Sequence, residues 1–296
     1  MKQLKGRVAV VTGAGSGIGR GVAQELAAEG CKLALVDINA ETLEETAEML
    51  KSAAPALSTH VVDVSDREAM LTLPEAVIAE HGEVHVVVNN AGVAVFGTFD
   101  EMSWEHIEKV INVNLWGVLH GSKAFLPYLA MVDEAWIINI SSVFGLAAIP
   151  TQSIYCATKF AVRGFTETLD EELRGTHIGV SVVHPGAIDT AIVHSPSYDQ
   201  GASENSKKHF ARHGMDPRKA GRVIVDGMKA GKLRIMVGKE APLIDLVKRI
   251  APVAGNRFLV NQTVKTMGLQ ELRDRKLAKF LADAETRRAE QETGDS

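Results

Sequence analysis

Tyr155 and Lys159 stand four residues apart, and their types and spacing indicate proton transfer. On a helix, positions i and i+4 share one face, so the phenol and the ammonium would be neighbours. A free tyrosine has a pKa of about 10, and lowering this pKa to near 7 takes about 4 kcal/mol in favour of the phenolate. A nearby ammonium supplies part of that energy, so Tyr155 is a candidate acid and base for a substrate oxygen. Ser142, 13 residues before Tyr155, is a candidate hydrogen-bond donor to the same oxygen.

The Tyr-x-x-x-Lys pattern also fits an exposed amphipathic helix, so its interpretation depends on whether the chain binds a nucleotide. Residues 12–19 read TGAGSGIG, where the first predicted strand turns into the first helix. Glycine permits positive φ and close approach of a ligand, and a helix start offers unpaired N–H groups to a pyrophosphate. The spacing G-x-x-x-G-x-G indicates a wider variant of the usual turn; a tight turn without a ligand is the alternative. The candidate cofactor-binding residues here are Gly13, Ser16, Gly17, Ile18 and Gly19.

Asp37 ends the second predicted strand, 18 residues after Gly19. A carboxylate there can accept hydrogen bonds from both hydroxyls of an adenosine ribose, and it would repel a 2′-phosphate. Positions 16 and 38 are Ser and Ile, so neither offers a basic side chain to such a phosphate. Asp37 therefore favours NAD over NADP, the alternative being a solvated helix N-cap.

Polar residues also follow the third and fourth predicted strands, in Asp63-Val64 and in Asn89-Asn90-Ala91-Gly92. Ligands of open α/β sheets bind at the carboxyl ends of strands. Asp63, Val64 and Asn90 are therefore candidates for adenine and ribose contacts, although bare turns use the same residue types.

The elements that must position these residues alternate along the chain. Short β-branched runs predict seven strands, at residues 7–12, 32–37, 59–63, 84–89, 136–140, 178–183 and 233–237. Most of these runs are apolar throughout, as a parallel sheet covered on both faces requires. The segments between them that predict crossover helices are residues 18–30, 40–53, 66–82, 104–130 and 154–175. This alternation predicts a doubly wound, mostly parallel seven-stranded Rossmann-type sheet with helices on both faces.

We expect one dinucleotide-binding and catalytic domain over residues 1–238, because no linker or repeat divides them. Residues 239–296 predict a helical extension, with helices at 242–250 and from 269 to about 288. We expect this extension to pack on the same domain, with disorder over residues 289–296. A frayed solvated tail and a membrane-surface or lid role are the alternatives.

Composition excludes several classes of protein. The net charge of -5 argues against nucleic acid and anionic lipid as general partners. No export signal is visible, and every apolar run is shorter than the roughly 18–20 residues of a membrane span, so we expect a cytoplasmic protein without membrane association. Cys31 and Cys156 are far apart and form no metal-binding pattern, so free thiols are expected.

Taken together, the motifs resemble the main subfamily of the short-chain dehydrogenase/reductase family. Over about residues 5–238 the family's motifs follow in order: TGAGSGIG, Asp63, NNAG, Asn114, Ser142, YCATK and Pro185-Gly186. The resemblance implies that Tyr155 is the proton donor or acceptor, with Ser142 steadying the reacting oxygen. It also implies that Lys159 binds the nicotinamide ribose and lowers the tyrosine pKa, and that Asn114 holds a water linking Lys159 to solvent.

The resemblance further implies that Ile188 and Thr190 grip the nicotinamide carboxamide. The family's tetramer interface uses its C-terminal edge, where this chain has an extension, so we expect a homodimer or a homotetramer. The family's lid would lie between Thr190 and Pro217. His209 and His213 in that segment stand at i, i+4, but without a third ligand we expect no metal site.

The sequence thus predicts an NAD-dependent oxidoreductase acting on a secondary alcohol or ketone. Residues 93–96, 143–150 and 192–193 are the expected pocket walls, and their apolar side chains indicate a hydrophobic substrate. Two alternatives stay open: a β-ketoacyl-thioester reductase of the same fold, and a nucleotide-sensing binding module without catalysis.

Overall fold

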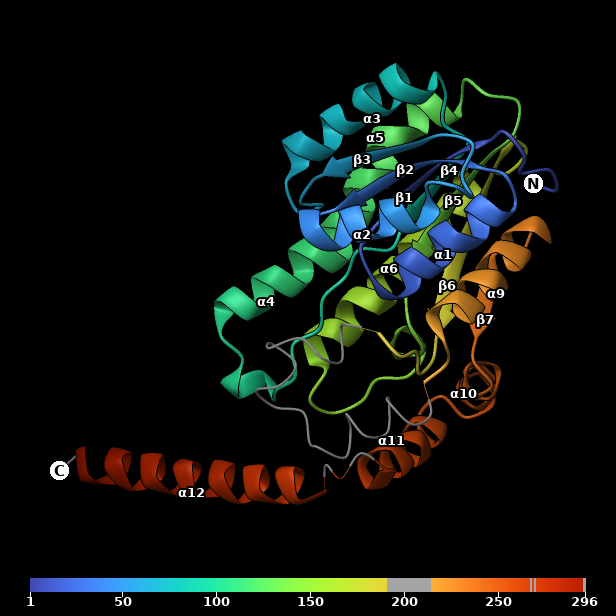
Figure 1. Ribbon diagram of the computed structural model, residues 1–296. Coiled ribbons are helices and arrows are strands. Elements are labelled where there is room, and N and C mark those ends of the chain that lie inside the picture. Colours follow the sequence, from blue (N-terminus) through green and yellow to red (C-terminus); the bar gives the residue numbers. More distant parts are fainter. Residues whose placement is uncertain (191–213, 267, 269, 295–296) are drawn as a thin grey trace.

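A parallel β-sheet forms the centre of the molecule (Figure 1). The structure, a computed structural model, describes residues 1–190, 214–266, 268 and 270–294. Seven strands lie in the order β3-β2-β1-β4-β5-β6-β7, and every neighbouring pair is parallel. The strands are β1 (Val8–Thr12), β2 (Lys32–Asp37), β3 (Leu57–Val61), β4 (Val86–Asn89), β5 (Ala135–Ile140), β6 (Ile178–Pro185) and β7 (Arg234–Val237). The predicted doubly wound sheet is confirmed.

Helices cover both faces of the sheet, and an apolar core lies under each set (Figure 1). One face carries α1 (Gly17–Ala28), α2 (Ala40–Leu50) and α9 (Pro217–Lys229). The other carries α3 (Arg67–His81), α5 (Gly117–Leu129) and α6 (Ser153–Glu172). Because β2 and β4 flank β1, the direction of winding reverses there, and the carboxyl ends of these strands border the place where open α/β sheets bind ligands.

Several elements differ from the prediction, and the ends of β4 and β6 differ by two residues. β3 begins two residues earlier than expected, because this edge strand alternates half-buried and exposed side chains instead of forming an apolar run. The predicted helix over residues 104–130 is divided into α4 (Trp104–Ile111), a π-helical turn (Asn112–Trp116) and α5. Helix α9, which leads to β7, was absent from the predicted crossovers. Short 3-10 turns η1 (Phe99–Glu101) and η3 (Val143–Gly145) follow β4 and β5.

The C-terminal extension forms α10 (Glu240–Ile250), α11 (Ala254–Thr266) and α12 (Gln270–Gly294), of which α11 was not predicted. Helix α10 contacts β7, η3 and α11. Helix α12 instead runs away from the body of the molecule (Figure 1). Its described side chains are largely exposed, since its few apolar residues are spread among many charges. Among the described residues, no helix is both long and apolar enough to cross a membrane.

Candidate active site

A chamber of about 1090 Å³ lies at the carboxyl ends of the strands. Most of the predicted site residues line it: Gly13, Ser16, Gly17, Ile18, Asp37, Asp63, Val64, Asn90, Ser142, Tyr155, Lys159, Ile188 and Thr190. Gly19 and Asn114 lie behind this lining. Of the expected walls, Val93, Ala94, Val143 and Phe144 line the chamber, whereas residues 192–193 lie outside the described residues, as do His209, His213 and most of the expected lid.

The glycine turn joins β1 to α1 and shapes one end of the chamber. Gly13 and Gly17 have φ of 64° and 51°, a region that favours glycine. A Cβ on Gly19 would overlap the Gly13 carbonyl oxygen, so only glycine lets the turn close. The Ser16 hydroxyl, at the N-cap of α1, makes no cap hydrogen bond. The first turn of α1 therefore presents backbone N–H groups and the positive end of a helix dipole to an anion.

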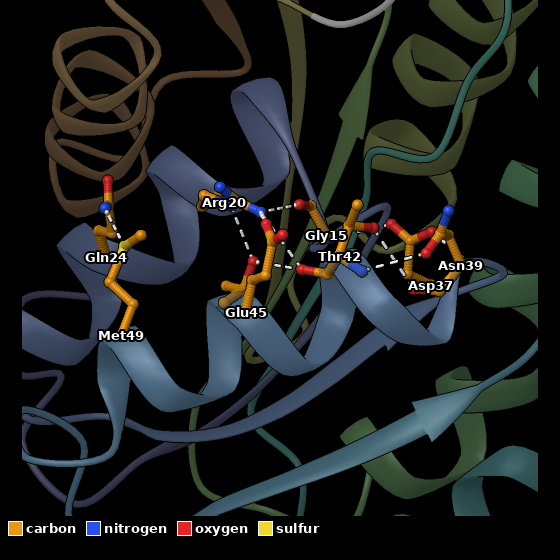
Figure 2. Close-up of polar contacts among 9 residues, drawn as sticks. Gly15, Arg20, Gln24, Asp37, Asn39, Thr42, Glu45 and Met49 are labelled. Atoms are coloured by element: carbon orange, nitrogen blue, oxygen red, sulfur yellow. Dashed lines mark hydrogen bonds and ion pairs between the residues drawn. The ribbon is translucent and has the colours of Figure 1, made fainter.

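Asp37 connects this turn to the start of α2, as Figure 2 shows. Its carboxylate accepts hydrogen bonds from the Gly15 backbone N–H (2.9 Å) and from the Asn39 backbone N–H (3.0 Å). Asn39, and not Asp37, is the N-cap of α2, because its side chain accepts from the Thr42 backbone N–H. The carboxylate is held by the backbone and keeps lone pairs that can accept from ribose hydroxyls.

Arg20, which the sequence analysis missed, braces the same corner from α1 (Figure 2). Its guanidinium donates to the Gly15 carbonyl oxygen, to the Thr46 hydroxyl (2.8 Å) and to the Glu45 carboxylate (3.1 Å). Arg20 directly follows the glycine motif, and this position was the sequence feature that could have identified it. Because these groups occupy the guanidinium, Arg20 acts as a structural brace in this arrangement.

Asn90 and Asp63, which are expected to contact adenosine, also make different hydrogen bonds within the fold. The Asn90 side chain donates to the backbone carbonyls of Thr12 (2.9 Å) and Gly13 (3.2 Å), so it holds the glycine turn against β4. The Asp63 carboxylate accepts from the backbone N–H (2.9 Å) and hydroxyl (2.7 Å) of Ser65. Both residues nevertheless line the chamber, together with Val64.

Ser142 and Tyr155 meet at the floor of the chamber. Ser142 follows β5 and Tyr155 lies in the first turn of α6, so the sheet and one helix fix their separation. Burial raises the pKa of Tyr155 to about 12, and a hydrogen bond with Ser142 opposes this rise in pKa. The Ser142 carbonyl oxygen lies 3.0 Å from Nδ1 of the buried His184, which positions the serine from behind. The pair can hold one substrate oxygen between two hydroxyl groups.

Lys159 is 3% exposed, and its Nζ lies 5.6 Å from the centre of the Tyr155 ring. Nζ donates a hydrogen bond to the Ile140 carbonyl oxygen (2.9 Å). Burial lowers the pKa of Lys159 to about 8. In the protein alone, burial is the main influence on the pKa of Tyr155; the expectation that Lys159 and a bound nicotinamide cation together lower this pKa stays a prediction.

Asn114 lies in the π-helical turn, which turns its side chain toward the strand ends. Its amide exchanges two hydrogen bonds with the Val93 backbone, at 2.8 Å and 2.9 Å. A Cβ on Gly92 would lie 3.2 Å from Asn114 Oδ1 and 3.6 Å from Lys159 Nζ, so both side chains flank this glycine. Asn114 thus fixes the loop after β4 close to Lys159. π-Helical turns often occur at functional sites.

The C-terminal extension and the residue before α6 contribute chamber residues that were not predicted from the sequence. Glu240, at the start of α10, accepts a hydrogen bond from the Ala187 backbone N–H (2.7 Å), next to Ile188. Ile244 of α10 and three polar residues of α11, Gln262, Thr263 and Thr266, also line the chamber. Gln152 joins them from the residue before α6. No local motif marks these positions, because only the fold brings the extension to the site.

The arrangement fits a nicotinamide dinucleotide. The glycine turn and the start of α1 suit a pyrophosphate, and the Asp37 carboxylate suits a ribose. The Ser142–Tyr155 pair, Ile188 and Thr190 line the same chamber, and Thr190 lies beside Gly17 of the glycine turn. A dinucleotide bound by these groups would place its reactive ring near the two hydroxyls.

Comparisons with known proteins agree with this geometry. The model of the short chain dehydrogenase family matches residues 7–201. SadH of Mycobacterium tuberculosis is 42% identical over 272 residues, which cover 90% of this chain and 98% of SadH. A short chain dehydrogenase/reductase from Burkholderia phymatum, solved in complex with NAD, has a TM-score of 0.78 at 29% identity and covers 84% of this chain and 95% of its own. An alcohol dehydrogenase from Thermococcus sibiricus, solved with 5-hydroxy-NADP, has a TM-score of 0.68 at 29% identity, covering 78% and 95% of the two chains.

Proposed function

Since this chain belongs to the short-chain dehydrogenase/reductase family and is an oxidoreductase with a nicotinamide cofactor, we propose that it interconverts hydrophobic secondary alcohols and ketones with NAD. The observation that carries the proposal is the Ser142–Tyr155 pair at the floor of the chamber that also holds the glycine turn. A hydroxyl pair beside a hydride-transferring ring is what carbonyl reduction requires.

The side chains divide the proton chemistry between them. Bound nicotinamide supplies or accepts the hydride. Ser142 hydrogen-bonds the substrate oxygen, and Tyr155 Oη donates a proton to it during reduction or takes one during oxidation. Because burial keeps the pKa of Tyr155 high, the phenol of the protein alone is neutral near neutral pH and can donate its proton during reduction. Lys159, held by the Ile140 carbonyl, is placed to bind the nicotinamide ribose and to add positive charge near the phenol.

Asp37 supports NAD as the cofactor. Its carboxylate is fixed by two backbone N–H groups at the place where a 2′-phosphate would have to lie. The neighbouring Ile38 is 65% exposed and brings no charge, and Arg20 is bound to Glu45 and Thr46. The Asp37 carboxylate would therefore repel the 2′-phosphate of NADP by roughly several kcal/mol without compensation from a positive charge.

The walls support a hydrophobic substrate body. Val93, Ala94, Val143 and Phe144 line the chamber near the strand ends, and Ile244 does so from α10. Apolar walls with a few fixed polar groups are typical of small-molecule sites.

The test is ketone reduction and alcohol oxidation by the purified protein, with NAD(H) and NADP(H) compared. We expect turnover with NAD(H) at a higher kcat/KM, and a loss of about 100-fold or more in kcat for Tyr155→Phe. Binding of NADH, followed by its fluorescence, should not change in that variant. Tyr128→Phe makes the same substitution on α5, outside the chamber lining, and should retain full activity.

Other outcomes favour the alternatives. A strong preference for NADPH and β-ketoacyl thioesters would identify a thioester reductase. Nucleotide binding without turnover of any alcohol or ketone would indicate a nucleotide-sensing module. Full activity of Tyr155→Phe would contradict the mechanism itself.

A further inference from the structure

Gln152 lines the chamber, and its side-chain nitrogen has no protein partner. Gln152 is 2% exposed, and its Nε2 is enclosed and forms no hydrogen bond. Within the described part of the chain, only the backbone carbonyl of this residue is engaged, by the Cys156 N–H (2.8 Å). Gln152 therefore lines the chamber and has a buried side-chain nitrogen without a hydrogen-bond partner.

Such an amide is costly in the protein alone. A buried donor without a partner destabilises a protein by about 1–3 kcal/mol, and native proteins have few of them. Leucine or methionine at position 152 would fill similar space without this cost. A substrate atom that accepts a hydrogen bond inside the chamber accounts for the amide.

The backbone holds Gln152 close to the reacting groups. Gln152 immediately precedes α6, three residues before Tyr155. The preceding residue, Thr151, has a φ of 68°, and among the described residues it is the only non-glycine with positive φ. Its carbonyl accepts a hydrogen bond from the Gly97 N–H (3.0 Å), which fixes the turn from the loop after β4. A strained β-branched residue persists only where its surroundings hold it, so the amide has a defined position.

We propose that the Gln152 amide binds a second, uncharged oxygen of the substrate, on a carbon close to the reacting one. This inference rests on the proposed function and narrows the substrate class to ketones and secondary alcohols with a neighbouring hydroxyl or ester oxygen. The amide is neutral, so it suits a neutral oxygen better than a carboxylate, whose burial needs a paired cation.

Matched ketones test the proposal. A straight-chain methyl ketone is compared with the same ketone carrying a hydroxyl on the adjacent carbon, and with the corresponding β-keto methyl ester. We expect the native protein to have a kcat/KM about tenfold higher for at least one oxygen-bearing compound. Gln152→Met, which keeps the length of the side chain, should abolish this preference and change kcat/KM for the plain ketone by less than about threefold.

Gln24→Met is the matched control, since Gln24 lies on α1 and its amide bonds Met49 Sδ away from the chamber (Figure 2). It should leave the preference unchanged. Gln152→Glu is a second variant of nearly the same shape; because it replaces the donor with a carboxylate, it should lose the preference for the keto ester, whose oxygens can only accept.

Two results would overturn the inference. One is an equal loss of kcat/KM for the plain and the oxygen-bearing ketones in Gln152→Met, which would indicate that Gln152 has a structural role. The other is an absence of preference in the native protein. Binding of the same ketones to the NADH complex, measured by NADH fluorescence, separates this inference from the proposed function. If no ketone is turned over, the proposed function fails, while selective loss of binding of the oxygen-bearing ketone in Gln152→Met would still support the role of the amide.

Discussion

His184 lies behind Ser142 without exposed surface, and burial lowers its pKa to about 4. In the unfolded chain its pKa is about 6.5, so between pH 6.5 and pH 4 the unfolded state binds the proton and the folded state does not. The contribution of His184 to the free energy of unfolding should therefore be complete above pH 6.5 and fall by up to about 3 kcal/mol as the pH drops to 4.

His184→Asn isolates this effect, because an asparagine amide can still donate to the Ser142 carbonyl but does not titrate in this range. Urea unfolding at a series of pH values should show that the free energy of unfolding falls less steeply with decreasing pH in the variant than in the native protein. Burial also lowers the pKa of His60, His81 and His85, and these residues titrate in both proteins. Parallel curves for the two proteins would show that His184 does not contribute.

At the scale of elements, α1 and α9 touch through glycines. A Cβ on Gly221 of α9 would overlap the Gly21 carbonyl oxygen of α1, so the two helices pack with their backbones in contact. Gly221→Ala should lower the free energy of unfolding by about 1–3 kcal/mol, because the helices must move apart.

Gly164→Ala in α6 is the matched control, since no atom lies within 4 Å of the Cβ it would add. Alanine is the better helix former there and should stabilise the protein by about 0.5–1 kcal/mol. Thermal or denaturant unfolding of the two variants should therefore give shifts of opposite sign. Two shifts of the same sign would contradict the packing described for α1 and α9.

The elements also show how far sequence reasoning reaches. Long apolar runs such as β1, β4 and β5 predicted their strands because burial on both faces leaves a strong local pattern. The edge strand β3 and the π-helical turn at Asn112–Trp116 did not follow local patterns, since their limits depend on neighbouring elements. In the site, the glycine turn and the Tyr155–Lys159 spacing are local signals.

Gln152 and Glu240 could not be selected from the sequence, because their importance arises from burial and from contacts between distant segments. The pKa of Tyr155 in the protein alone could not be derived from the sequence for the same reason. Sequence gave the spacing of the phenol and the ammonium, whereas the desolvation that dominates the pKa belongs to the folded chamber.

At the scale of the whole molecule, the extension has two parts with different roles. Glu240, α10 and α11 complete the chamber, while the described side chains of α12 are largely exposed. A chain that ends after Gly268 should keep its melting temperature within a few degrees and its kcat/KM within about twofold, because the described side chains of α12 are not buried against the body.

A chain that ends after Gly238 should instead show a KM for the ketone raised about tenfold or more, because Ala187 loses its carboxylate partner and the chamber loses one wall. Steady-state kinetics and thermal unfolding of both truncated chains provide the measurement. Equal KM values for the two truncated chains would show that α10 and α11 do not form part of the active site.

The contact between α1 and α9 has a consequence for how the protein is made. Residues 17–28 complete their packing only against residues 217–229, which leave the ribosome some 200 residues later. Until then the nascent chain carries the first nucleotide-binding segment with part of its apolar face uncovered, a state in which large domains are prone to aggregate. Productive folding therefore waits for the last third of translation, and we expect chains that stop before α9 to be prone to aggregation.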